Sequence, residues 1–153
     1  MIRRPRRLVL IVVGAAVFLV ISGILARWLS LENVERSDIL SLLTAEAHGD
    51  ARAMLAQLYH CDARCQGFVR SDARRLRRTG SVLILADQSR TSYALTSTTG
   101  DTRIAWQTAH SLPIVQCVTV SRTGNAISGL TLRLLAVGGE IPSQSDCVRR
   151  YDG

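Results

Sequence analysis

Leu8–Ala26 reads Leu-Val-Leu-Ile-Val-Val-Gly-Ala-Ala-Val-Phe-Leu-Val-Ile-Ser-Gly-Ile-Leu-Ala, and this stretch determines how the rest of the chain is placed. It carries no charged side chain, and thirteen of its residues are Leu, Val, Ile or Phe. As an α-helix, a stretch of this length extends for roughly 28 Å, close to the bilayer hydrocarbon core of about 30 Å. Insertion of the thirteen large apolar side chains contributes roughly −5 kcal/mol. The stretch therefore predicts a transmembrane helix that leaves the remaining chain on one side.

The residues that flank this stretch predict its orientation. The segment before it contains four arginines, Arg3, Arg4, Arg6 and Arg7. Basic residues next to a membrane span stay on the cytoplasmic side. We therefore expect a cytoplasmic tail over 1–7, a single-pass anchor in the cell membrane over 8–29, and an extracytoplasmic remainder. Trp28 then falls at the outer interface, where an indole ring is well accommodated.

A cleaved signal peptide is the alternative interpretation of the same stretch. Signal-peptide apolar cores run for about 7–15 residues and end in an Ala-x-Ala-like site. The apolar core here is longer, and its weak site is Ile24-Leu25-Ala26. We therefore expect an uncleaved signal-anchor. A mature protein that has lost about 26 residues would show the alternative to be right.

Composition limits the class of protein that follows the anchor. The chain has 153 residues, so about 120 remain, which suits one compact domain. The net charge is +7, but the tail arginines account for part of it, and residues 27–153 carry 15 arginines against 12 acids, or +3. That charge is too small to predict a nucleic-acid binder, and no nucleic-acid motif is present.

Four cysteines follow the anchor, and an even number in an oxidising compartment predicts two disulfide bonds. Three pairings are possible. We expect Cys61–Cys65 and Cys117–Cys147, because each pair joins neighbouring parts of the predicted element map. The residue types of a zinc site are also present, in His60, Cys61, Cys65 and, as a further candidate, His110. The oxidising side of a membrane favours the disulfide, so no metal or other cofactor is expected.

The sequence pattern changes from helical to strand periodicity at residue 81. Apolar residues at helical spacing predict three helices, over 30–48, 51–60 and 67–78. The first is either capped afresh at Ser37 and Asp38 or continuous with the anchor. Alternating, β-branched stretches predict five strands, over 81–87, 91–98, 102–108, 114–122 and 127–137. The turns predicted between them fall at 87–90, 99–101 and 123–125, with a loop before residue 114.

Short turns imply an antiparallel meander, and helices followed by strands indicate the α+β class. We expect the amphipathic helices to cover the apolar face of the sheet. The predicted extracytoplasmic domain spans 30–140, and a polar tail over 141–153 is tied back by Cys147. Gly138-Gly139 is interpreted as an ordinary strand exit.

The order of a helix, a Gly-Asp break, two further helices and a long sheet resembles the cystatin-like or NTF2-like superfamily. The residues that carry the resemblance are Ala-His-Gly-Asp at 47–50 and the strand pattern over 81–137. It implies a curved sheet of about five strands that wraps around two or three helices as a cone. The anchored arrangement is also similar to accessory proteins of bacterial Mce lipid-uptake systems and to the anchored assembly factor of type IV secretion machines. Both groups imply a scaffolding or assembly role.

A run of basic residues near the third predicted helix is one candidate binding surface. It contains Arg70, Arg74, Arg75, Arg77 and Arg78, offset only by Asp72. One interpretation is a surface for anionic lipid headgroups or cell-envelope polymers, where each contact contributes about 1 kcal/mol. The alternative is an ordinary solvated helix face.

A pocket between sheet and helices is the other candidate. The residues considered for it are Tyr93, Trp106 and His110, with Asp87 and Asp101 as possible acids. The alternative interpretation, which the sequence favours, is a core position for Trp106 and a loop position for His110. General acid–base catalysis requires two such groups within reach of one substrate, and no spacing ties these together. The sequence therefore favours a non-enzymatic binding or assembly module that recognises an envelope protein or an anionic lipid or polymer. A ligand-binding or enzymatic cone is the alternative.

Overall fold

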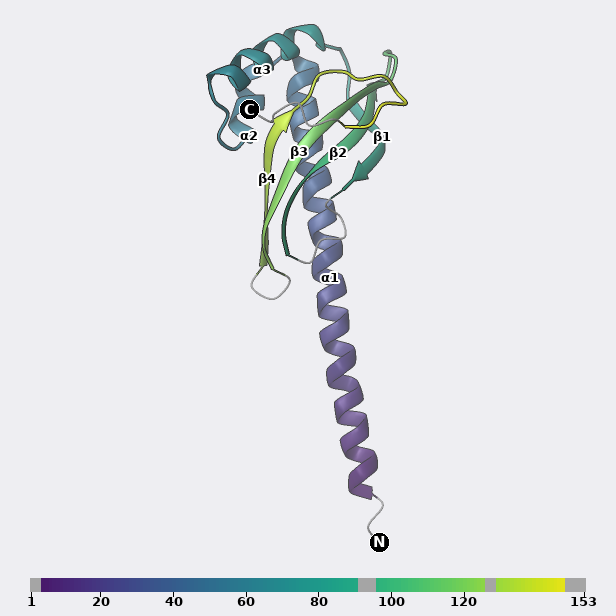
Figure 1. The fold of residues 1–153 in the computed structure, drawn as a ribbon. Helices are drawn as coiled ribbons and strands as arrows, with labels where there is room; N and C mark the ends of the chain where they lie inside the picture. Colours follow the sequence, from purple (N-terminus) through teal and green to yellow (C-terminus); the bar gives the residue numbers. More distant parts are fainter. Residues whose placement is uncertain (1–3, 91–95, 126–128, 148–153) are drawn as a thin grey trace.

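The structure is a computed structural model that describes residues 4–90, 96–125 and 129–147. Three helices, α1 (Arg4–His48), α2 (Ala51–Gln57) and α3 (Ala63–Arg75), precede four strands. The strands are β1 (Val82–Ser89), β2 (Thr96–Thr108), β3 (Ile114–Asn125) and β4 (Gly129–Val137). They form one open antiparallel sheet in the order β1-β2-β3-β4 (Figure 1). The α+β class and the meander are thus confirmed, with four strands in the described part of the chain where five were predicted.

Helix α1 joins the apolar segment to the domain without a break. It runs for 45 residues, so the helix predicted over 30–48 is a continuation of the one that contains Leu8–Ala26. That segment is long and apolar enough to cross a membrane, and none of it is buried against the rest of the chain. We call the end of the domain near this segment proximal and the opposite end distal. Figure 1 shows α2 and α3 at the distal end and the apolar segment projecting from the proximal end.

The distal half of α1 packs against the inner face of the sheet. Its buried apolar side chains, Ile39, Leu42 and Leu43, pack in one core cluster with Ile104 and Trp106 of β2 and with residues of β3 and β4. Glu35 and Glu46 of α1 contact Arg122 and Gln116 of β3, respectively. The two acids are 11 residues apart on the helix, or about 17 Å, and their partners are six residues apart on the strand, or about 20 Å. Helix and strand therefore lie nearly alongside each other, and side chains occupy the space where a cone would have its cavity.

Two predicted turns are wrong because pairing with a neighbouring strand overrides the preference of turn-forming residues. Residues 99–101, read as Thr-Gly-Asp, lie in the middle of β2, where Gly100 pairs with Val120. Gly100 is buried, and Asp101 accepts a hydrogen bond from Thr119 Oγ1 at 2.7 Å. The turn predicted over 87–90 is also wrong, because β1 continues to Ser89. The predicted strand over 91–98 falls largely outside the described residues.

The two short helices differ from their predicted bounds for local reasons. Asp50 caps α2 by accepting hydrogen bonds from the backbone N–H of Arg52 and Ala53, as predicted from the Gly-Asp break. However, α2 ends at Gln57 because Leu58 is extended and forms a parallel bridge to Leu134 of β4. Helix α3 begins early, at 63, since Asp62 caps it, and it ends at 75 where 78 was predicted.

Both predicted disulfides are confirmed. Cys61 is bonded to Cys65, and Cys117 of β3 is bonded to Cys147 in the C-terminal segment. The first bond closes a loop of four residues at the start of α3. The second holds the segment 138–147, which we call the strap, against the outer face of the sheet. The four thiols are therefore unavailable as zinc ligands in this state.

We expect loss of the Cys117–Cys147 bond to destabilise the domain more than loss of Cys61–Cys65. The loop-entropy relation gives about 3.5 kcal/mol for a separation of 30 residues and about 2 kcal/mol for a separation of four. Thermal unfolding of the full chain in detergent would compare the Cys117→Ser/Cys147→Ser and Cys61→Ser/Cys65→Ser variants. Equal losses, or a larger loss for the short loop, would contradict this expectation.

Candidate functional site

The five arginines singled out in the sequence lie at the distal end of the domain. Arg70, Arg74 and Arg75 are on α3, and Arg77 and Arg78 follow its C-terminal end. We call these five residues the arginine surface. Arg78 N–H donates to the carbonyl of Ala47, at 2.7 Å, which fixes this segment to the distal end of α1 (Figure 1). Ala47 follows the apolar segment by 21 residues, so the arginine surface lies about 30 Å beyond it along the helix axis.

Three of the five guanidinium groups are free to bind an external anion. Among the described residues, Arg70, Arg74 and Arg77 form no ion pair with a carboxylate. All three are exposed, and Arg70 makes one long hydrogen bond, at 3.4 Å, to Gln66. The stem of Arg77 lies against Gly49, whose added Cβ would be 3.2 Å from Arg77 Cδ. The surface is therefore anchored by packing while its charged groups remain in solvent.

The other two arginines have structural partners. Arg75 Nη2 is paired with Asp72 Oδ1 at 2.9 Å. Arg78 Nη1 donates to the carbonyl of Arg77 at 2.9 Å and, more weakly, to that of Arg75 at 3.5 Å. Side chains that bond the last carbonyls of a helix stabilise its C-terminus. These two residues thus hold the end of α3 in place.

The charge of the domain is segregated between its two parts. Residues 48–80, which contain α2 and α3, carry seven arginines against three acids, a net charge of +4. The remainder of residues 27–153 carries eight arginines against nine acids, a net charge of −1. The modest overall charge of +3 therefore conceals a basic distal end on a nearly neutral domain.

A buried polar cluster lies beneath the arginine surface, where α1, α3 and β3 meet. Gln116 Nε2 donates to Glu46 Oε1 at 2.8 Å, to the carbonyl of Gly138 at 3.1 Å and to Asp72 Oδ2 at 3.4 Å. Its Oε1 accepts from the indole N–H of Trp106. Glu46, Asp72 and Gln116 are all at least 98 % buried. The cluster joins both helices to the sheet.

The pKa of Glu46 is raised to about 9, first by burial and then by a hydrogen bond with Asp72 and by the negative charge of Asp72, against the opposing effects of Gln116 and Arg75. Glu46 is therefore protonated at neutral pH. Glu46 Oε2 has no hydrogen-bond partner among the described residues. Protonation of Glu46 avoids two buried negative charges in one cluster with Asp72.

The sequence contains a signal for these buried acids that the prediction missed. Glu35, Ile39, Leu42 and Glu46 follow one another at helical spacing, so both acids fall on the apolar stripe of α1. Asp72 likewise lies between Val69 and the other buried residues of α3. An acid on an apolar stripe is expected to be buried with a partner. The identity of that partner depends on the tertiary structure.

A shallow pocket of about 300 Å³ lies at the outer edge of β4. Its lining residues are Asp38, Ala56, Gln57, Leu58, Tyr59, Leu132, Arg133 and Leu134. The Arg133 guanidinium lies 3.8 Å from the centre of the Tyr59 ring, a cation–π contact. Burial raises the pKa of Asp38 above its usual range. The pocket is open to solvent and is separate from the interior between sheet and helices.

The structure does not bring the residues of the predicted pocket together. Trp106 is fully buried in the core, and its N–H is bonded to Gln116. His110 is exposed in the turn between β2 and β3. Tyr93 lies outside the described residues. Asp87 is exposed on β1. Asp101 accepts a hydrogen bond from Thr119 on the outer face of the sheet. Trp106 therefore lies in the core and His110 in a turn, and the two do not form a joint site in the described structure.

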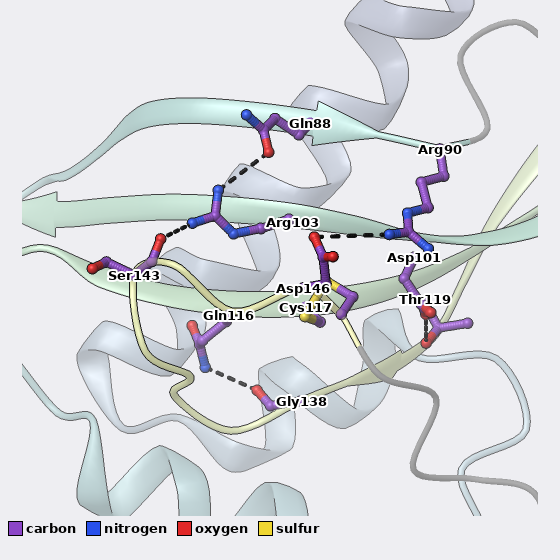
Figure 2. The surroundings of a disulfide bond; sticks show 11 residues. Gln88, Arg90, Asp101, Arg103, Gln116, Cys117, Thr119, Gly138, Ser143 and Asp146 are labelled. Carbon is purple, nitrogen blue, oxygen red and sulfur yellow. Dashed lines mark hydrogen bonds and ion pairs between the residues drawn. A yellow bond between two sulfur atoms is a disulfide. The ribbon is translucent and has the colours of Figure 1, made fainter.

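The strap crosses the outer face of the sheet (Figure 2). Backbone N–H groups of Gly138 and Ile141 donate to the carbonyls of Cys117 and Val115, at 2.7 Å and 2.8 Å. Arg103 on β2 donates to the carbonyl of Ser143 and, at 3.2 Å, to Gln88 of β1. An added Cβ on Gly138 would be 3.2 Å from the Cys117 carbonyl oxygen, so the glycine permits this close approach and is more than a strand exit.

Comparison of the chain with protein-family models, with curated proteins and with solved structures finds no match.

Proposed function

We propose that this protein is a single-pass, membrane-anchored binding module of the bacterial cell envelope, with residues 1–7 in the cytoplasm. Its arginine surface recognises a linear anionic polymer on the extracytoplasmic side. The observation that carries the proposal is the continuous helix α1, which both contains the apolar segment and packs along the whole sheet. It acts as a stalk that holds a basic surface at a fixed distance from the bilayer.

The distance argues against a role for the arginine surface in binding lipids of its own membrane. Charges in solvent are largely screened beyond about 8 Å at physiological ionic strength. The arginine surface lies about 30 Å beyond the apolar segment. Its partner is therefore a component that extends into the envelope, and of the two partners expected from the sequence, the polymer is favoured over the lipid headgroup.

The arrangement of the free arginines favours a ligand with repeated charges. Arg70 and Arg74 are four residues apart on α3, so they are neighbours on one helix face at about 5–6 Å, and Arg77 follows just beyond the end of the helix. A guanidinium group binds phosphate or carboxylate oxygens in a bidentate manner. Several such groups on one surface suit a chain of phosphates or carboxylates better than a single small anion.

The alternative of a ligand-binding cone receives less support. Large apolar side chains of α1 and β2 occupy the space between helix and sheet. Catalysis is not part of the proposal, because the candidate acid–base residues lie apart in the described structure.

A binding measurement with long-chain inorganic polyphosphate tests the proposal. The full chain, held in nanodiscs of zwitterionic lipid, is titrated with this probe. We expect Arg74→Gln/Arg77→Gln to weaken binding by about 10- to 30-fold, since each contact contributes about 1 kcal/mol. Arg36→Gln/Arg90→Gln removes the same charge from exposed sites elsewhere and should change binding by less than about twofold.

Equal losses in the two variants would mean that only net charge matters and would remove the assigned role of the arginine surface. The same titration with anionic vesicles in place of polyphosphate separates the polymer from a lipid surface. Tighter, arginine-dependent binding to vesicles would contradict the proposed partner.

A further inference from the structure

The strap begins beside the C-terminal end of α3, at the distal end of the domain. Strand β4 ends there, and Gly139 follows its last residue by two positions (Figure 1). An added Cβ on Gly139 would be 2.9 Å from Arg75 Nη2 and 3.6 Å from Phe68 Cζ. The first of these separations is shorter than van der Waals contact. A glycine at this position therefore allows the strap to lie directly against the Arg75 guanidinium group.

A buried carboxylate holds the same guanidinium group. Asp72 Oδ1 accepts from Arg75 Nη2 at 2.9 Å, and the Asp72 side chain is only 1 % exposed. The other carboxylate oxygen, Asp72 Oδ2, accepts a hydrogen bond from Gln116 Nε2 at 3.4 Å. Because Asp72 is buried and bonded through both oxygens, it cannot follow Arg75 into solvent. Asp72 and Gly139 together therefore give Arg75 one defined position in the free protein.

Most of the Arg75 guanidinium group nevertheless remains available to a ligand. The Arg75 side chain is 58 % exposed, and the contact with Asp72 uses one of its five N–H donors. The remaining four donors form no hydrogen bond with any other group in the described part of the chain. They suffice for a bidentate contact with an anion along one edge of the guanidinium plane.

A fixed arginine differs in binding from the free ones. Arg70, Arg74 and Arg77 have no carboxylate partner among the described residues, so a ligand must order their side chains. Ordering a long side chain weakens binding, and Arg75 is already ordered in the free protein. Asp72 compensates the charge of Arg75, so Arg75 contributes through directed hydrogen bonds more than through net charge.

We propose that Arg75 is the fixed anion-binding group of the arginine surface, positioned by Asp72 and by the close approach of Gly139, and that it binds one anionic group of the polymer in a bidentate manner. The assignment rests on the proposed function, because it adds a residue to the same site. It places the start of the strap at the edge of that site. The buried cluster then supports binding as well as folding, since it fixes the carboxylate that orients Arg75.

The variant Gly139→Ala tests the assignment without changing the charge of the arginine surface. The backbone of Gly139 lies outside the left-handed region, so alanine fits there, and its methyl group displaces the end of a flexible side chain. With the full chain in zwitterionic nanodiscs, we expect long-chain polyphosphate to bind about three- to tenfold more weakly. Gly67→Ala is the matched control, because its added Cβ lies in open space on α3, and it should change the affinity less than about 1.5-fold.

A double variant shows whether the effect of Gly139→Ala passes through Arg75. Arg75→Gln removes the guanidinium group and should weaken polyphosphate binding at least as much as Gly139→Ala does. In the Arg75→Gln background, Gly139→Ala should have no further effect, because the group that it displaces is absent. A loss of affinity that persists in this background would mean that the methyl group acts on the strap alone and would overturn the assignment. If Arg75→Gln does not fold, the comparison of Gly139→Ala with Gly67→Ala still decides.

The Arg74→Gln/Arg77→Gln variant separates this assignment from the proposed function. Weaker polyphosphate binding in that variant and in Gly139→Ala, with none in Gly67→Ala, would support both. If the double arginine variant weakens binding and Gly139→Ala does not, the arginine surface binds the polymer without Arg75, and only this assignment is wrong. If the wild-type chain does not bind polyphosphate, both are wrong.

Discussion

Replacement of Arg122 by alanine is expected to lower the free energy of unfolding by roughly 3–5 kcal/mol, the largest effect of any single substitution considered for this protein. Arg122 Nε and Nη2 both donate to Glu35 Oε2, the former at 3.2 Å. Thr102 Oγ1 donates to Glu35 Oε1 at 2.7 Å. Both charged side chains are almost fully buried, at 1 % and 3 % exposure. Removal of the arginine leaves a buried, unpaired carboxylate.

Thermal and urea unfolding of the full chain in detergent would measure this loss. Arg103→Ala is a suitable control, because it removes an arginine from the outer face that is hydrogen-bonded but only partly buried, and it should cost about 1 kcal/mol or less. The double variant Glu35→Leu/Arg122→Met replaces both charges by apolar groups and should recover most of the stability. If Arg122→Ala lowers the free energy of unfolding no more than Arg103→Ala does, the ion pair of Glu35 and Arg122 is not what joins α1 to the sheet.

The Glu46→Gln variant is expected to be more stable than the wild-type protein at alkaline pH, by a few kcal/mol at pH 8. Glu46 has a pKa of about 9 when folded, mainly because of burial, against 4.5 as the ordinary value. Between these values the folded state retains a proton that the unfolded state has lost. Stability therefore decreases as pH rises from about 4.5 to 9, by about 1.4 kcal/mol per pH unit from this group. Glutamine has the shape of the protonated carboxyl group of Glu46 but does not titrate.

The measurement is the free energy of unfolding as a function of pH for both proteins. The two curves should meet near pH 4 and diverge as pH rises, with wild type falling below the variant. Glu140→Gln, at an exposed carboxyl in the strap, serves as a control for the loss of one acid. Parallel curves for Glu46→Gln and wild type would mean that Glu46 is ionised in the folded protein and that the buried cluster is organised differently.

The parts of the fold that were predicted from sequence are those fixed by short-range chemistry. The apolar segment, the break at Gly49 and Asp50, and the Cys61–Cys65 bond depend on residue type and spacing along the chain. The Cys117–Cys147 bond followed from the predicted order of neighbouring elements. The sheet was less predictable because pairing partners decide whether a turn-forming sequence turns. Gly100 and Asp101 are turn residues by type, yet pairing with Val120 and Thr119 of β3 holds them in a strand.

The candidate site was predicted only in part for a similar reason. The arginine run is evident in the sequence, but its height above the apolar segment required the knowledge that α1 is continuous. The ion pair of Glu35 and Arg122 joins residues 87 positions apart, and the contact of Glu46 with Gln116 spans 70. Each residue lies at a buried position of its own periodic pattern. That pattern predicts burial and leaves the partner undetermined.

The most direct test of the central claim is the height of the arginine surface above the bilayer. A fluorescent amino acid at Thr79, an exposed residue beside the arginine surface, serves as the energy-transfer donor to headgroup-labelled lipid in proteoliposomes. A rigid, continuous α1 predicts a donor roughly 25 Å above the headgroups, because the headgroup layer covers part of the distance of about 30 Å from the hydrocarbon core, with no change when anionic lipid is added. A donor within about 10 Å of the bilayer surface would contradict the rigid stalk and would mean that the arginine surface lies close enough to bind lipid headgroups.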